Sequence, residues 1–243
     1  MPSPRICLYD IETAPSLGLY FDRYREGNII SEVREWHIMS FSYKWQGDRK
    51  IHYHCLPDYP SFEKDIHDDK ALVSDLHRLI YSEADCLIAH NGDRFDQRKT
   101  KARFFKHGLP PPPPIKTIDT LKIAKRVFKL DSNRLADIGG YLGLGGKYVT
   151  KSDLWLRCYN GDREAYKEMG RYNKRDVDLL EKVHERLARW NPNPPILMTG
   201  DGCPSCHSHN IQRRGYNIAR KSKTARMQCQ ECGQWFSGQR EAA

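Results

Sequence analysis

The sequence predicts an α/β domain, in which helices flank a mixed β-sheet, followed by a small cysteine-containing module. Apolar runs typical of strands come first and then alternate with helical patterns up to about residue 190. Asn191-Pro-Asn-Pro-Pro195 stops the last helical pattern, and two C-x-x-C pairs follow it. We therefore predict a domain over residues 1–190, a proline-rich linker over 191–202 and a separate module over 203–243.

The composition is that of a globular chain with an excess of positive charge. Charged residues make up 29% and hydrophobic residues 39%, and the formal net charge is +9. This charge favours a polyanionic partner, above all nucleic acid, although solubility or a membrane surface would also account for it. No apolar run approaches the ~20 residues that span a bilayer, and the N-terminus does not resemble a signal peptide. We expect an intracellular or cytoplasmic protein with no membrane partner.

The first predicted strand carries two acids that are two residues apart. Residues 6–11 suit a buried strand, on which side chains at i and i+2 point to the same face, so Asp10 and Glu12 should lie side by side. Two adjacent carboxylates repel each other and are costly to bury unless a cation holds them. Because surface strands often carry such pairs, a metal site needs further acids from elsewhere in the chain.

The later elements follow from periodicity and turn residues. After an irregular segment over 15–35, we expect strands over 36–45, 50–55, 84–89 and 115–118. We expect helices over 68–82, 94–106, 120–128, 133–142, 162–169 and 171–190. The five prolines over 110–114 predict an extended loop, and the glycine-rich segment 139–146 predicts a turn.

Two more acids could complete a metal site. In the last predicted helix, stepping back one turn from Leu180 on the apolar stripe gives Asp176, and another turn gives Tyr172. Asp96 begins a basic helix after a predicted strand. An ion pair with a nearby arginine would also explain Asp176, and helix capping would also explain Asp96. Four acids can hold two divalent ions for phosphoryl chemistry, and Mg²⁺ or Mn²⁺ suits such oxygen ligands.

These residues fall into three short motifs that resemble those of the DEDD, or DnaQ-like, 3′–5′ exonuclease superfamily. The motifs are Asp10-Ile-Glu12-Thr13, His90-Asn91-Gly-Asp-Arg-Phe95-Asp96 and Tyr172-Asn-Lys-Arg-Asp176. The resemblance extends over about residues 5–190. It implies a ribonuclease H-like fold and the hydrolysis of phosphodiester bonds at the 3′ end of a nucleic acid.

The resemblance also implies catalytic roles for individual residues. Tyr172 would orient the attacking water, as in the tyrosine (DEDDy) subclass, whereas the histidine subclass would place its base at the position of Arg171. The ligands of two Mg²⁺ or Mn²⁺ ions would be Asp10, Glu12, Asp96 and Asp176.

Two further positions in the motifs concern the substrate, and a third offers an alternative to one of the metal ligands. Thr13 and Asn91 match substrate-binding positions of the family, with Thr13 beside the 3′-terminal nucleotide. Asp93 is an alternative to Asp96, but Phe95-Asp96 matches the motif better.

Two C-x-x-C pairs, separated by 22 residues, predict a metal site in the C-terminal module. Two such knuckles resemble a zinc ribbon, in which one structural Zn²⁺ has four tetrahedral thiolate ligands, here Cys203, Cys206, Cys229 and Cys232. His207 and His209 are alternative ligands that the second pair makes unnecessary. The other cysteines are scattered and suit ordinary core positions: Cys7, Cys55, Cys86 and Cys158.

Basic and aromatic residues interleave in this module. They are Arg213, Arg214, Tyr216, Arg220, Lys221, Lys223, Arg226, Trp235 and Phe236. This mixture suits a surface that grips a phosphate backbone and stacks on exposed bases. Trp235 and Phe236 also suit the small core of the module, and a surface that docks a protein is another interpretation.

The leading hypothesis is a metal-dependent 3′–5′ exonuclease that acts on nucleic acid, DNA ahead of RNA, and whose zinc ribbon helps to hold the substrate. A polymerase or another replication or repair protein is a candidate partner. The second hypothesis is a ribonuclease H-like endonuclease or structure-specific nuclease with the same metal site. The third is an inactive module that binds nucleic acid or protein, and the presence of all four acids and Tyr172 argues against it.

Overall fold

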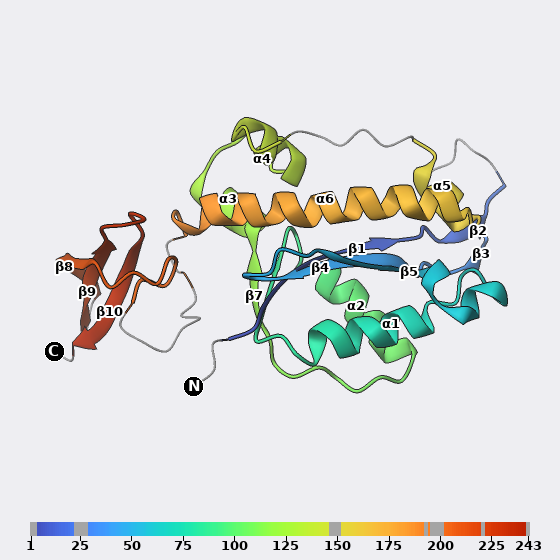
Figure 1. The fold of residues 1–243 in the computed structure, drawn as a ribbon, viewed down its shortest axis with the longest axis horizontal. Helices are drawn as coiled ribbons and strands as arrows, with labels where there is room; N and C mark the ends of the chain where they lie inside the picture. The colour runs from blue at the N-terminus through green and yellow to red at the C-terminus, as the bar shows by residue number, and fades with distance from the viewer. Residues whose placement is uncertain are drawn as a thin grey trace.

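A five-stranded mixed sheet forms the centre of the structure, a computed structural model that describes residues 4–21, 29–145, 152–191, 194, 202–219 and 222–241. The strand order is β5-β4-β1-β6-β7 (Figure 1). The strands are β1 (Ile6–Thr13), β4 (Ile38–Trp45), β5 (His52–Cys55), β6 (Cys86–Ala89) and β7 (Lys116–Asp119). The central strand β1 is antiparallel to β4 and parallel to β6. The predicted α/β fold with a mixed sheet is confirmed.

Helices cover both faces of this sheet (Figure 1). One face packs against the long helix α6 (Arg163–Ala188), and on the same side lie α3 (Thr120–Val127), α4 (Leu135–Tyr141) and α5 (Leu154–Tyr159). The other face packs against α1 (Lys70–Leu76), its π-helical continuation η3 (His77–Tyr81), and α2 (Asp96–Lys106). Two short 3-10 turns, η1 (Leu56–Asp58) and η2 (Pro60–Glu63), precede α1.

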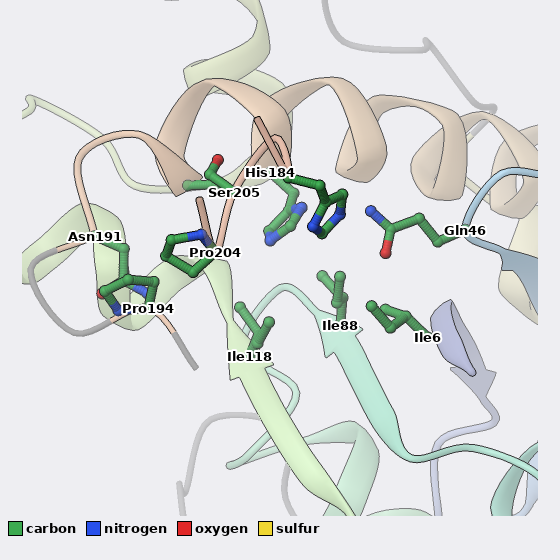
Figure 2. A pocket seen from close by; sticks show the side chains of 11 residues that line it. Ile6, Gln46, Ile88, Ile118, His184, Asn191, Pro194, Pro204 and Ser205 are labelled. Carbon is green, nitrogen blue, oxygen red and sulfur yellow. The ribbon is translucent and has the colours of Figure 1, made fainter. Parts of the chain in front are cut away.

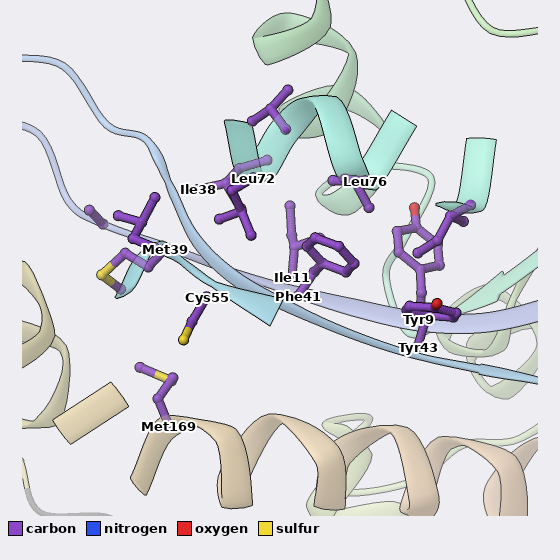
Figure 3. Packing of buried hydrophobic residues seen from close by; sticks show 14 of the residues in the cluster. Tyr9, Ile11, Ile38, Met39, Phe41, Tyr43, Cys55, Leu72, Leu76 and Met169 are labelled. Atoms are coloured by element: carbon purple, nitrogen blue, oxygen red, sulfur yellow. The ribbon is translucent and has the colours of Figure 1, made fainter. Parts of the chain in front are cut away.

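The alternation of side chains along β1 decides which residues meet which helices. Tyr9 and Ile11 belong to the core that includes Leu72 and Leu76 of α1 (Figure 3). Leu8 belongs to the other core, which α6 lines with residues such as Val177, Leu180 and Val183. Because successive strand residues point to opposite faces, Asp10 and Glu12 share the face of Leu8 and point toward α6.

The structure differs from the predicted elements in three places. The segment predicted to be irregular contains a small two-stranded sheet, β2 (Leu17–Leu19) and β3 (Ser31–Arg34). Helix α5 was not predicted. The helices predicted over 162–169 and 171–190 form the single helix α6, because Gly170 does not interrupt it. A Cβ atom at Gly170 would lie 2.7 Å from the ring of Tyr53, so this glycine allows α6 to approach β5 closely.

The C-terminal module forms a three-stranded antiparallel sheet beyond the C-terminal end of α6 (Figure 1). Its strands are β8 (Ile211–Ala219), β9 (Ser222–Cys229) and β10 (Trp235–Glu241). Gln234 is 1% exposed, and its side-chain amide donates to the carbonyl oxygen of Asn191 at 3.1 Å. A cavity of about 50 Å³ lies at this junction, lined in part by His184, Pro204 and Ser205 (Figure 2).

Parts of the predicted organisation lie outside the described residues. Most of the predicted linker does, as do Arg220, Lys221 and the last residue of the glycine-rich segment. The predicted domain boundaries therefore stay predictions. Among the helices in the described ranges, none combines the length and the apolar character that crossing a bilayer requires.

Candidate active site

Three carboxylates from distant parts of the sequence converge between β1 and α6. Asp10 and Glu12 come from β1 and Asp176 from α6, and their ligand oxygens all lie within 4.8 Å of one another. All three side chains are half-buried. The strand alternation and the helical spacing that predicted their faces are both present, and the packing of α6 on β1 brings the two faces together.

Two neighbouring side chains hold these carboxylates in place. The Asn173 side-chain amide donates to Oδ2 of Asp10 at 2.5 Å, and the Trp155 indole N–H donates to Oε2 of Glu12 at 3.1 Å. Sequence reasoning missed both residues. Asn173 precedes Asp176 by three positions on α6, so the helical spacing could have indicated it. Trp155 lies on α5, and its position offers no comparable signal in the sequence.

Asp96 lies beside this cluster without belonging to it. It is buried at the start of α2, and its Oδ1 accepts the backbone N–H of Ile11, the residue between the two acids of β1, at 3.2 Å. Within the described residues, the three-carboxylate group does not include it. Its charge nevertheless raises the pKa values of Asp10 and Glu12, so it contributes to the same electrostatic site.

The carboxyl groups are held in an environment that disfavours their ionised form. Burial raises the pKa of Glu12 to about 8, that of Asp96 to about 7 and that of Asp176 to about 6. For Asp10, burial and then the charges of Glu12, Asp96 and Asp176 raise the pKa well above its ordinary value. A divalent cation would relieve this repulsion, and a set of carboxylate oxygens is what Mg²⁺ and Mn²⁺ prefer. The residues present therefore fit such a metal.

Tyr172 lies one helical turn before Asp176 and contacts the cluster. Its hydroxyl forms a side-chain hydrogen bond with Asp176. Its ring meets that of Trp155 edge-on, with centroids 5.5 Å apart at 75°. Burial, together with the charges of Asp176 and Glu12, raises the pKa of Tyr172 above its ordinary value. The hydroxyl thus stays protonated at neutral pH and can act as a hydrogen-bond donor.

The other residues predicted from the motifs lie at the ends of strands. Thr13 is the half-buried last residue of β1. Asn91 follows β6 with φ = 65°, and its backbone N–H donates to Oδ1 of Asp119 at 2.9 Å. Asp93, the alternative to Asp96, forms an ion pair with Lys122 at 2.6 Å.

Removing the indole N–H of Trp155 should weaken metal binding. In Trp155→Phe the ring can still pack on Tyr172, but Glu12 loses its donor, and loss of such a supporting hydrogen bond typically costs 10–100-fold in metal affinity. Titration of the metal-free protein with Mn²⁺, followed by electron paramagnetic resonance, measures this. Trp45→Phe, which changes a tryptophan at the end of β4, is the control and should keep the wild-type affinity. Unchanged affinity in Trp155→Phe would refute the role of this contact.

The four predicted zinc-ligand cysteines also cluster. Their sulfurs lie within 4.8 Å of one another, with Cys203 and Cys232 3.6 Å apart and Cys206 and Cys229 3.5 Å apart. The two knuckles have the same geometry. The fifth residue of each, His207 or Gly233, has a positive φ (63° and 77°) and donates its N–H to the carbonyl of the first cysteine.

This cysteine cluster fits a metal better than it fits four free thiols. Burial opposes ionisation of Cys229, but backbone N–H groups of Cys232 and Glu231 outweigh it and lower the pKa of Cys229 to about 7. Burial and the neighbouring cysteines raise the pKa values of Cys206 and Cys232, so these thiols need a cation to ionise together. A tetrahedral set of four sulfurs suits Zn²⁺. Neither His207 nor His209, the alternative ligands, belongs to the cluster within the described residues.

Comparison with known proteins places the fold. The family B DNA polymerase from the hyperthermophilic archaeon Pyrobaculum calidifontis has a similar structure, with a TM-score of 0.57 and 15% sequence identity. The similarity covers 78% of this chain and 25% of the polymerase, so the chain spans about a quarter of the polymerase's length. No match to the curated proteins was found. The family described as RNase_H superfamily matches residues 36–188, which is more than half of the chain. The chain belongs to the RNase_H superfamily.

Proposed function

We propose that this protein is a metal-dependent 3′–5′ exonuclease of the tyrosine subclass. The observation that carries the proposal is the convergence of Asp10, Glu12 and Asp176 within 4.8 Å, with Tyr172 hydrogen-bonded to Asp176. Membership of the RNase_H superfamily supports a nuclease. The three sequence motifs support the 3′–5′ direction.

The proposed chemistry divides between the metal and the chain's own residues. Two bound Mg²⁺ or Mn²⁺ ions would activate a water and stabilise the leaving oxygen. Asp10, Glu12, Asp96 and Asp176 would hold these ions. The protonated hydroxyl of Tyr172 would help to orient the attacking water, and Thr13 and Asn91 would contact the terminal nucleotide. Asn173 and Trp155 keep the carboxylates of β1 oriented.

We further propose that the four cysteines hold one structural Zn²⁺ as a zinc ribbon, and that this module helps to hold the nucleic acid. DNA is the proposed substrate ahead of RNA. A polymerase or another replication or repair protein is the proposed partner, since a similar fold occurs within a DNA polymerase. A panel of single- and double-stranded DNA and RNA tests the substrate.

A 3′-blocked oligonucleotide tests the direction of attack. With Mg²⁺ or Mn²⁺, we expect stepwise shortening of a 5′-labelled strand with a free 3′ end and no products from the same strand with a blocked 3′ end. Products from the blocked strand would support an endonuclease or structure-specific nuclease instead. Absence of cleavage of every substrate, with binding retained, would support an inactive binding module.

Removing the hydroxyl of Tyr172 should slow the reaction without unfolding the protein. In Tyr172→Phe the ring can still pack on Trp155, but the donor near Asp176 is lost, so we expect kcat to fall about 100-fold. Tyr166→Phe is a matched control on the same helix, because the buried hydroxyl of Tyr166 has no hydrogen-bond partner among the described residues. That control should keep full activity. Wild-type kcat in Tyr172→Phe would remove this residue from the proposed mechanism.

A further inference from the structure

The positive charge of the chain is concentrated in the C-terminal module. Residues 203–243 contain seven lysines and arginines against two glutamates, whereas residues 1–202 contain the remaining 33 basic against 29 acidic residues. The module therefore carries five of the nine net positive charges in about a sixth of the chain. Such an excess on a small surface attracts a polyanion, with phosphate groups as counter-charges.

Tyr216 is the centre of a cation–aromatic group on one face of the module's sheet. The pairing register places Arg213 opposite Met227, Tyr216 opposite Ala225, and Lys223 two residues before Ala225, so the three side chains share one face. The Arg213 guanidinium lies 4.4 Å and the Lys223 ammonium 4.8 Å from the centroid of the Tyr216 ring. The tyrosine is 37% exposed and so lies outside the core.

The opposite face carries a smaller group of the same kind. The Arg226 guanidinium lies 5.5 Å from the centroid of the Trp235 ring, and Trp235 is 42% exposed. The interpretation of Trp235 as a core residue of the module is therefore wrong. An exposed aromatic ring flanked by cations is the arrangement that stacks an unpaired base while neutralising its phosphates. The Tyr216 face has two cations on one ring and is the stronger candidate.

The module lies far from the three-carboxylate cluster along α6. Asp176 and the helix end at Ala188 are twelve residues apart, which corresponds to about 18 Å at a rise of ~1.5 Å per residue. The module contacts the chain beyond that end, through Gln234 and Asn191. A stacked strand rises ~3.4 Å per nucleotide, so about five nucleotides span the distance from Asp176 to the end of α6. The module lies beyond that end (Figure 1).

We propose that the Tyr216 face of the module binds single-stranded nucleic acid about five or more nucleotides from the 3′ terminus, so that tight binding requires a single-stranded tail of at least that length. This inference rests on the proposed function, because it places the terminus at Asp10, Glu12 and Asp176. The module then determines how long a substrate must be for tight binding, and it does not contact the bond that is cleaved.

Binding of oligonucleotides of increasing length tests the proposal. The full-length Asp176→Asn protein, which should not cleave, is titrated with 5′-labelled single strands of three to fifteen nucleotides, and fluorescence anisotropy gives the Kd. Adding Tyr216→Ala should weaken binding of strands longer than about eight nucleotides roughly tenfold and leave trinucleotides unaffected. Tyr216→Phe keeps the ring and should keep the affinity.

Ile218→Ala is the matched control, since Ile218 is an exposed apolar residue on the same strand, lies opposite Lys223 and carries no aromatic ring. It should bind every length like the parent protein. Zinc content of one ion per chain verifies that each variant keeps the module.

An equal effect of Tyr216→Ala on all lengths, or no effect on any, would overturn the proposal, and the second outcome would favour a protein-docking module. Length-dependent binding without any hydrolysis by the wild-type chain would refute the exonuclease and leave this surface standing.

Discussion

Replacing Asp10 or Asp176 with asparagine should reduce hydrolysis by about 10³-fold or more. Each substitution removes a charged oxygen ligand from the group within 4.8 Å, and a loss of about 4 kcal/mol of transition-state stabilisation corresponds to that factor. Initial rates on a single strand with a free 3′ end, at saturating Mg²⁺, measure the effect. Asp178→Asn is a matched control on the same helix, because Asp178 lies outside the three-carboxylate cluster and forms an ion pair with the exposed Lys182 at 2.7 Å. It should retain wild-type rates.

Asp10→Asn, which should slow hydrolysis, should increase the stability of the metal-free protein. The pKa values of the clustered acids are raised in the folded state, so the wild-type chain loses stability as pH rises from the unfolded values near 4 toward about 8, the folded value for Glu12. In Asp10→Asn one of the repelling charges is absent. We therefore expect Tm to rise by several degrees at about pH 8 and by little at about pH 5.

This pair of measurements separates a catalytic loss from misfolding. A variant that is inactive and also less stable would show that Asp10 supports the fold and leave its role as a ligand without support. An active Asp176→Asn protein with wild-type metal affinity would contradict the site itself. Mg²⁺ should raise the Tm of the wild-type chain more than that of either variant, because binding to the folded state stabilises it.

Removing Zn²⁺ from the C-terminal module should unfold that module and leave the α/β domain folded. The module buries few side chains within its described residues, among them Cys203, Ala225, Cys229 and Gln234, so metal binding of about 10 kcal/mol or more would supply most of its folding free energy. In Cys206→Ser, hydrogen exchange should lose protection in β8, β9 and β10 and keep it in β1 and α6. Elemental analysis should find one zinc per wild-type chain and much less in the variant.

A cysteine outside the cluster provides the control for this experiment. Cys86 is buried in β6, far along the chain from the knuckles, and Cys86→Ala should keep one zinc per chain. If Cys206→Ser binds one zinc with unchanged affinity, the four-cysteine site is wrong. If its α/β domain unfolds as well, the module is part of one cooperative unit with the sheet.

Local periodicity was enough to predict much of the candidate site. On β1, a period of two places Asp10 and Glu12 on one face, and on α6 a period of about 3.6 places Asp176 and Tyr172 on the stripe of Leu180. Both statements depend only on neighbours within a few residues. For the same reason the paired knuckles of the cysteine module could be predicted from spacing.

Other features depend on contacts between distant segments, which no local pattern encodes. Trp155 reaches Glu12 because α5, 143 residues further along the chain, packs at the end of β1. Gly170 resembles a helix break in the sequence, yet it lies inside α6 because its missing side chain makes room for Tyr53. Trp235 has a large apolar side chain that would suit a core, yet it is exposed.

The sequence by itself thus determined the fold class, the faces of the acids and the cysteine spacing, because hydrophobic period and backbone geometry act locally. The tertiary structure decided which faces meet, and so which hydrogen bonds hold the carboxylates, how close Asp96 comes to them, and which aromatics stay exposed. Those outcomes depend on how α6, α5 and the C-terminal sheet pack, and packing depends on shape complementarity between surfaces far apart in the chain.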